Sequence, residues 1–195
     1  ESVGVGFQPP TLRLYAWNPP CLSLGYGQLS SDVDFERCQR LGWDVVRRPT
    51  GGRAILHTDE LTYSLALPAG DELAAGSVVE SYWRISTALI AGLTRLGANP
   101  VAEARNKQAE NSPICFDTPS HYEITVNGRK LVGSAQVRRK GGVLQHGTLP
   151  LTGDIARICD GLIFPHEDAR EMAKEQVRER ALTLAHALGR NVSWD

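Results

Sequence analysis

Three arginines surround two glycines in one short segment, which reads Arg47-Arg48-Pro49-Thr50-Gly51-Gly52-Arg53-Ala54. At a glycine turn, backbone N–H groups can face an anion with no Cβ in the way, and guanidinium groups bind anions strongly. The segment therefore predicts an anion-binding loop. A solvated hairpin tip is the alternative, because Gly-Gly between two short strands needs no ligand to explain it.

Cys115 is a candidate nucleophile. It lies between Pro113 and Pro119, in a turn-rich loop rather than on a packed helical face. A buried structural thiol is the alternative, because free cysteine is among the most buried residue types. The remaining cysteines are interpreted as structural; they are Cys21, Cys38 and Cys159. Because no CxxC motif is present, we expect no metal site, no disulfide scaffold and a reducing, cytoplasmic location.

Lys130 is followed closely by the small residues Gly133, Ser134 and Ala135, which would let a ligand approach the backbone. The alternative is an exposed strand lysine, because lysine is almost never buried unless it is paired.

Two histidines have polar neighbours that suggest acid–base or metal chemistry. His57 precedes Asp59 and Glu60, and His146 lies between Gln145 and Gly147. Neither histidine has the HxH or HxxxH spacing of a metal site. From spacing alone, both are interpreted as structural.

Alternating apolar residues predict the strands that must position these groups. The first half is expected to be mostly sheet, with strands at 11–17, 43–47, 54–57 and 61–67. Asn127-Gly128 predicts a hairpin between strands at 121–126 and 129–135, and a further strand is expected at 142–148. Lys130 would then lie near the start of a strand.

Two long amphipathic helices are expected. Ser77 and Glu80 form a capping box before a helix that ends at Gly97, and apolar spacing predicts a second helix over residues 167–188. Strands in blocks with two long helices indicate an α+β fold with a mostly antiparallel, mixed sheet packed against helices.

Composition limits the possible partners. The 195 residues have a formal net charge of -1 and suit a single domain. Without a strong positive field we expect no nucleic-acid partner, and no apolar stretch approaches the ~20 residues that span a membrane.

Taken together and in order, these motifs resemble the biotin/lipoate protein ligase superfamily. The resemblance extends from Pro19-Pro20, through Ser23-Leu24-Gly25-Tyr26 and the Arg-Gly segment as far as His57, to Lys130-x-x-Gly133-Ser134-Ala135-Gln136 and Leu144-Gln145-His146-Gly147. It implies an α+β fold like that of biotin and lipoate ligase catalytic domains, related to class II aminoacyl-tRNA synthetases. Residues 1–195 would form one such domain, and because Glu1-Ser2-Val3 is similar to the end of a helix in other members, we expect the first N-terminal residues to be missing.

Within that superfamily, the chain most resembles the cysteine-dependent octanoyltransferases. Arg53 stands where lipoate ligases typically have a third glycine, and Cys115 in Cys-Phe-Asp-x-Pro-Ser matches the acyl-accepting segment. The resemblance implies that Cys115 and Lys130 are catalytic. It also implies that the acyl pocket is built from Ser23, Gly25, Arg48, Thr50, Gly51, Gly52, Arg53, His57, Gly133, Ser134 and Ala135.

The implied reaction moves octanoyl from acyl carrier protein, through a cysteine thioester, to a lysine of the glycine cleavage H protein or another lipoyl-type domain. No cofactor would be required. One alternative is an ATP- and Mg²⁺-dependent lipoate-protein ligase, and another is an amidotransferase that moves octanoyl between lipoyl domains. A non-enzymatic acyl- or lipoyl-domain-binding module is a further alternative, which Cys115 and Lys130 disfavour.

Overall fold

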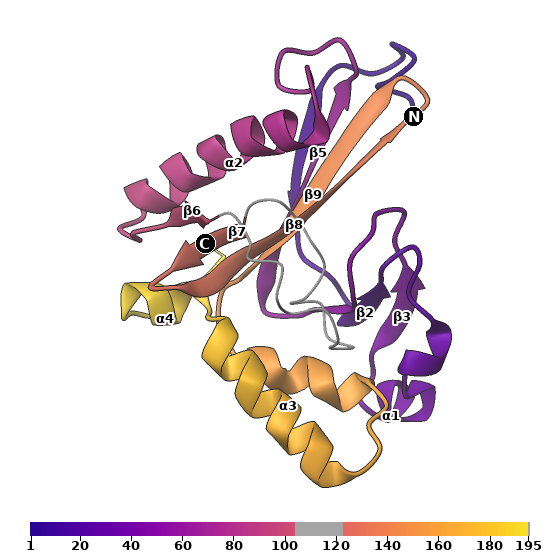
Figure 1. Cartoon of the computed structure of the whole chain (residues 1–195), viewed down its shortest axis with the longest axis vertical. Coiled ribbons are helices and arrows are strands. Elements are labelled where there is room, and N and C mark those ends of the chain that lie inside the picture. Colours follow the sequence, from indigo (N-terminus) through magenta and orange to yellow (C-terminus); the bar gives the residue numbers. More distant parts are fainter. Residues whose placement is uncertain (104–122, 195) are drawn as a thin grey trace.

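The computed structural model describes residues 1–103 and 123–194, and its largest element is a six-stranded sheet (Figure 1). The strand order is β1-β5-β9-β8-β7-β6, with every neighbouring pair antiparallel. Its strands are β1 (Thr11–Tyr15), β5 (Glu60–Pro68), β6 (Val101–Glu103), β7 (Glu123–Val126), β8 (Arg129–Arg139) and β9 (Gly142–Pro150). The Asn127-Gly128 turn has the positive φ angles, 52° and 70°, that a tight hairpin requires, which confirms the predicted β7–β8 hairpin. Residues 121 and 122 of that prediction lie outside the described residues.

One face of this sheet packs against helix α2 (Val78–Arg95). The predicted capping box is present, because Ser77 and Glu80 satisfy each other's backbone N–H groups. Ile85 and Leu93 of the helix are buried against sheet residues that include Leu67 and Tyr63. The helix thus ends as predicted, with Gly97 just beyond it at a φ of 97°.

A second, three-stranded sheet lies on the other side of the long strands (Figure 1). It contains β2 (Cys21–Leu24), β3 (Asp44–Arg47) and β4 (Ile55–His57), with β2 in the middle. The hairpin alternative for the Arg-Gly segment is therefore wrong, because β3 and β4 do not pair with each other. The strand β2 separates them, parallel to β3 and antiparallel to β4.

Short helices complete this second layer: η1 (Ser30–Asp32), α1 (Phe35–Arg40) and η2 (Ile155–Gly161). Leu22, Cys38 and Cys159 belong to its apolar core, together with Val177 of helix α3 (Glu167–Arg180). An α+β fold with a mostly antiparallel sheet is confirmed.

The long helix predicted over residues 167–188 is wrong in one respect, because it is two helices. Helix α3 ends at Arg180, and α4 (Leu184–Leu188) begins after Thr183, whose side chain caps it. Between them Ala181 is extended and forms a parallel bridge to Lys130, and the N–H of Leu182 donates to the carbonyl of Lys130. Pairing with the sheet overrides the helical spacing of the sequence here, and it anchors the backbone of Lys130.

Among the described residues, no helix combines the length and apolarity needed to cross a membrane.

Candidate active site

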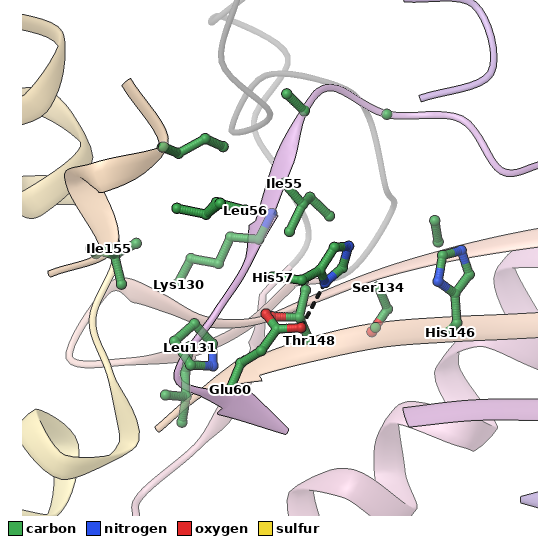
Figure 2. Close-up of a pocket in the computed structure, with 18 of the residues that line it drawn as sticks. Ile55, Leu56, His57, Glu60, Lys130, Leu131, Ser134, His146, Thr148 and Ile155 are labelled. Carbon is green, nitrogen blue, oxygen red and sulfur yellow. Dashed lines mark hydrogen bonds and ion pairs between the residues drawn. The ribbon is translucent and has the colours of Figure 1, made fainter. Parts of the chain in front are cut away.

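A cavity of about 340 Å³ opens between the two layers (Figure 2). Eight of the predicted site residues line it: Arg48, Gly51, Gly52, His57, Lys130, Gly133, Ser134 and Ala135. Four others, Ser23, Gly25, Thr50 and Arg53, are not among its lining residues in the described part of the chain. Cys115 lies outside the described residues.

The two leading arginines of the Arg-Gly segment hold backbone carbonyls. The Arg48 side chain is buried and donates to the carbonyls of Ser23, Gly51 and Arg53, at 2.8, 2.9 and 2.6 Å. Arg47 likewise donates to the carbonyls of Gly25, Tyr26 and Gln28. Both guanidinium groups bind the chain itself and fix the shape of the cavity wall, and anion binding by the loop stays a prediction.

Gly25 supports this wall from behind. A Cβ at this position would lie only 1.7 Å from the carbonyl oxygen of Gly52, so the two backbones can touch only because residue 25 is glycine. Gly25 therefore lies against Gly52, and neither Ser23 nor Gly25 is among the described residues that line the cavity.

A buried polar network forms the floor beneath His57. Its Nε2 lies 2.7 Å from Ser23 Oγ and its Nδ1 2.6 Å from Glu60 Oε1. Glu60 also accepts hydrogen bonds from the hydroxyls of Thr62 and Thr148. The predicted structural role of His57 is supported by these contacts, although its ring also lines the cavity.

His146 faces the Arg-Gly segment from β9, with its Nε2 2.6 Å from Thr50 Oγ1. Burial, followed by the charges of Arg48 and His57, lowers the pKa of His146 to about 4. The imidazole is therefore neutral near pH 7 and joins the six-stranded sheet to the turn that carries Gly51.

Lys130 reaches the cavity because β8 contains a bulge. Ile124 pairs with Val132 and Thr125 pairs with Lys130, so one step along β7 matches two along β8 and Leu131 is the extra residue. Paired residues share a face of a sheet and successive residues alternate. Lys130 and Val132 therefore face opposite sides, although they are two positions apart.

Lys130 lies on the face of the sheet that borders the cavity, and Gly133 lies on the same face. Figure 2 shows Lys130 among the cavity residues, with His57 and His146 reaching the same space from other strands. The Lys130 side chain is 14% exposed, and its Nζ lies 2.8 Å from Glu123 Oε1. Gly133 leaves room for it, because a Cβ there would lie 3.3 Å from Lys130 Cε.

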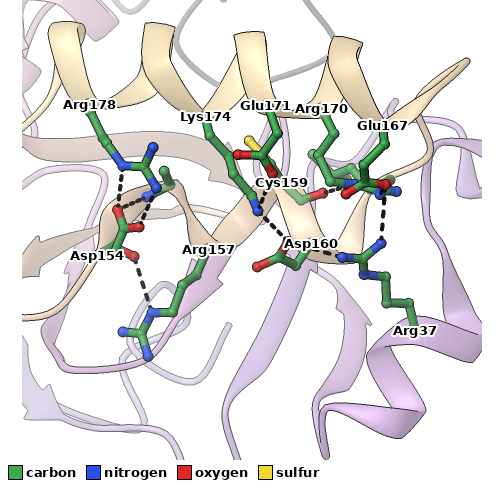
Figure 3. Close-up of polar contacts among 12 residues, drawn as sticks. Arg37, Asp154, Arg157, Cys159, Asp160, Glu167, Arg170, Glu171, Lys174 and Arg178 are labelled. Carbon is green, nitrogen blue, oxygen red and sulfur yellow. Dashed lines mark hydrogen bonds and ion pairs between the residues drawn. The ribbon is translucent and has the colours of Figure 1, made fainter.

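Ion pairs hold η2, which supplies the opposite wall (Figure 3). Asp160 of η2 pairs with Lys174 of α3 at 2.9 Å and with Arg37 of α1 at 3.4 Å. Asp154, which caps η2, pairs with Arg178 at 2.7 Å. These contacts fix Ile155 and Ile158, whose apolar side chains line the cavity with Ile55, Leu56 and Leu131.

Sequence reasoning missed Glu123 and the η2 residues, and it did not assign Glu60 to the site. Glu123 is separated from Lys130 by the predicted Asn127-Gly128 turn, so cross-strand pairing in that hairpin was the available signal. Within the described ranges, no group of three or more histidine, cysteine or acidic side chains is arranged to hold a metal ion.

The fold is that of lipoate-protein ligase catalytic domains. A structure of the bi-partite lipoate protein ligase system of Thermoplasma acidophilum matches with a TM-score of 0.76 and 23% identity, covering 95% of this chain and 66% of that chain. A lipoate-protein ligase A bound with ATP matches with a TM-score of 0.73 and 23% identity, covering 95% of this chain and 67% of that one.

Residues 1–195 match the family model of the lipoyl protein ligase A/B catalytic domain, and the chain belongs to this family. It is 46% identical over 195 residues to the octanoyltransferase LipM of Kyrpidia tusciae, covering 96% of this chain and 71% of that protein. It is 38% identical over 195 residues to the octanoyltransferase LipM of Bacillus subtilis, covering 96% of this chain and 70% of that protein. The resemblance predicted from the motifs is confirmed.

Proposed function

We propose that this chain is a protein N-octanoyltransferase that uses Cys115 as the acyl-accepting nucleophile and Lys130 as its catalytic partner. The observation that carries the proposal is the match to octanoyltransferases along nearly the whole chain, with Lys130 directed into a largely apolar cavity. The donor would be octanoyl-acyl carrier protein, and the acceptor a lysine of a lipoyl-type domain such as the glycine cleavage H protein. The enzyme would act in the cytoplasm.

In the first step the Cys115 thiolate attacks the donor thioester carbonyl, and the carrier sulfur departs as a thiolate. In the second, the neutral amine of the acceptor lysine attacks the Cys115 thioester, the Cys115 thiolate is released, and the proton lost by the amine goes to solvent, from which the carrier thiolate takes one up. The acyl group arrives already activated and the amide product is more stable than a thioester, so the reaction consumes no ATP. Lys130 would donate a hydrogen bond to the oxyanion of each step and favour the thiolate by its charge.

The other cysteines are poor nucleophiles, which supports Cys115. Cys21, Cys38 and Cys159 are buried with their thiols free. Burial raises the pKa of Cys21 and Cys159 to about 11, and it raises that of Cys38 as well. Their thiolate forms are therefore scarce at neutral pH.

The apolar cavity suits an alkyl chain. Ile55, Leu56, Leu131, Ile155 and Ile158 line it. Burial of each CH₂ group contributes about 0.8 kcal/mol, so an octanoyl tail gains several kcal/mol from this lining.

The test is intact-mass analysis after mixing with octanoyl-acyl carrier protein, with and without ATP and Mg²⁺. One octanoyl mass should appear without ATP, and peptide mapping should place it at Cys115. Neutral hydroxylamine should remove this thioester, whereas an amide on Lys130 would survive. Cys115→Ala should lose both the adduct and the acylated lipoyl domain, and Cys115→Ser should form an oxyester more slowly.

Two results would redirect the proposal. An absolute requirement for ATP with free octanoate or lipoate would identify a ligase, and undiminished transfer by Cys115→Ala would exclude the covalent route. Replacing the donor with an octanoylated lipoyl domain distinguishes an amidotransferase, which would use it in preference to the acyl carrier protein.

A further inference from the structure

We propose that Glu123 is a positioning residue for Lys130, because its carboxylate accepts a hydrogen bond from the ammonium group and holds that group at the cavity. This inference rests on the proposed function, in which Lys130 acts as a cation. The residue lies at the start of β7, across the hairpin from Lys130.

The geometry of the pair is close and sheltered. Glu123 Oε1 lies 2.8 Å from Lys130 Nζ, and the two side chains are 15% and 14% exposed. A charge this sheltered loses hydration, which costs free energy unless an opposite charge compensates. A carboxylate at hydrogen-bonding distance supplies that compensation and directs one N–H of the ammonium.

The backbone places both groups on one face. Glu123 and Thr125 are two positions apart on β7, so they share a face, and Thr125 pairs with Lys130 through the bulged register. The backbone of Lys130 is fixed separately by Ala181 and Leu182. Because the main chain is anchored by these contacts, the hydrogen bond to Glu123 acts on the side chain of Lys130.

The other charged or titratable groups of the cavity have their own contacts, among them Tyr82, whose hydroxyl donates to the carbonyl of Ser134 at 3.3 Å. His57 and Glu60 pair with each other, Arg48 holds backbone carbonyls, and His146 is neutral near pH 7. On the η2 wall, Arg157 pairs with Asp59 and Asp154 pairs with Arg178. None of these contacts reproduces the carboxylate that lies against Lys130 Nζ.

The decisive variant is Glu123→Gln, which keeps the shape and one acceptor oxygen but removes the charge. Glu123→Asp keeps the charge on a shorter side chain. The matched control is Glu171→Gln, which removes a carboxylate paired with another lysine, Lys174, at 2.9 Å on the surface of α3. Circular dichroism and thermal unfolding verify that each variant is folded.

The first readout does not depend on turnover. Trace acetylation of the protein at one fixed pH, quantified by mass spectrometry on the peptide that contains Lys130, reports how strongly that amine is protected by its contacts. Glu123→Gln should raise the acetylation of Lys130 by about tenfold, because the carboxylate 2.8 Å from its Nζ is lost. Glu171→Gln should leave it unchanged, and Glu123→Asp should recover most of the wild-type protection.

The second readout is the kinetics of octanoyl transfer. In Glu123→Gln kcat should fall while the KM for octanoyl-acyl carrier protein is unchanged, and Glu123→Asp should recover part of kcat. If Lys130 is acetylated equally in Glu123→Gln and in the wild type, the proposal is overturned. If acetylation rises but the wild type transfers no octanoyl group, Glu123 keeps its positioning role and the proposed function fails instead.

Discussion

Replacing Gly25 with alanine tests whether the cavity wall depends on direct contact between two backbones. The new Cβ would lie 1.7 Å from the carbonyl oxygen of Gly52 and 2.7 Å from its carbonyl carbon. Both atoms belong to the main chain, so no side-chain rotation can relieve the clash. The separation from the oxygen must about double before it reaches ordinary van der Waals contact.

The loss of folding free energy depends on the backbone at Gly52, which must move to relieve the clash. Gly52 lies between Gly51 and Arg53, whose carbonyls accept hydrogen bonds from the buried Arg48 side chain. Overpacking costs about 1–3 kcal/mol, and leaving a buried donor unsatisfied costs about the same again. We therefore expect Gly25→Ala to lose about 3 kcal/mol or more of folding free energy, which lowers the Tm of a domain this size by roughly 6–12 °C.

Gly51→Ala is the matched control, because an added Cβ there would meet no heavy atom within 4 Å among the described residues beyond its own chain neighbours. A glycine-to-alanine change without strain typically stabilises by about 0.4–1 kcal/mol through the unfolded chain. Differential scanning calorimetry of both variants provides the comparison. Equal Tm values for the two variants would refute the claim that the backbones of residues 25 and 52 are in contact.

Three further predictions concern single side chains. Lys130→Ala should lower kcat by about 10²-fold or more, because it removes a charge from the site, and it should also lower the Tm, because the sheltered Glu123 carboxylate loses the ammonium group 2.8 Å away. Stopped assays and calorimetry check this, and near-normal turnover would contradict it. Glu60→Gln should lower the free energy of unfolding in urea by about 1–3 kcal/mol. One of the two oxygens that accept from the hydroxyls of Thr62 and Thr148 becomes an amide nitrogen, which cannot accept a hydrogen bond. The pKa of His146 is lowered to about 4 in the folded protein, against about 6.5 in the unfolded chain. Between these two pH values the unfolded state binds more protons than the folded state. The free energy of unfolding should therefore rise with pH across this window, by up to about 3 kcal/mol. His146→Gln should remove that rise, and an unchanged pH dependence of urea unfolding would show that His146 is not its source.

Local signals in the sequence predict the local structure well. The capping box at Ser77 and the Asn127-Gly128 turn each specify their own conformation through neighbouring residues, and both are present. The break after Arg180 could not be predicted in this way. It depends on pairing between Ala181 and Lys130, which are far apart in the sequence, whereas helical spacing reports only on near neighbours.

The motifs predicted which residues belong to the site better than they predicted what each side chain does there. Arg48 belongs to the site, but its guanidinium binds backbone carbonyls, which neither charge nor spacing reveals. Ser23 supports His57 from behind the cavity, and a sequence pattern cannot distinguish a lining residue from the one beneath it. Glu123 was missed because its importance comes from a cross-strand contact with Lys130.

The extra residue in β8 affects how relatives of this chain should be aligned. Residue-by-residue alternation from Val132 would place Lys130 on the face buried under α2, whereas Leu131 reverses the parity and returns it to the cavity. An alignment can match Lys130 to a lysine of a relative and still place a gap on the wrong side of it within residues 129–133. The matched lysine would then be assigned to the opposite face of the sheet. In this hairpin, the position of an insertion or deletion carries as much information about the site as the identity of the amino acid.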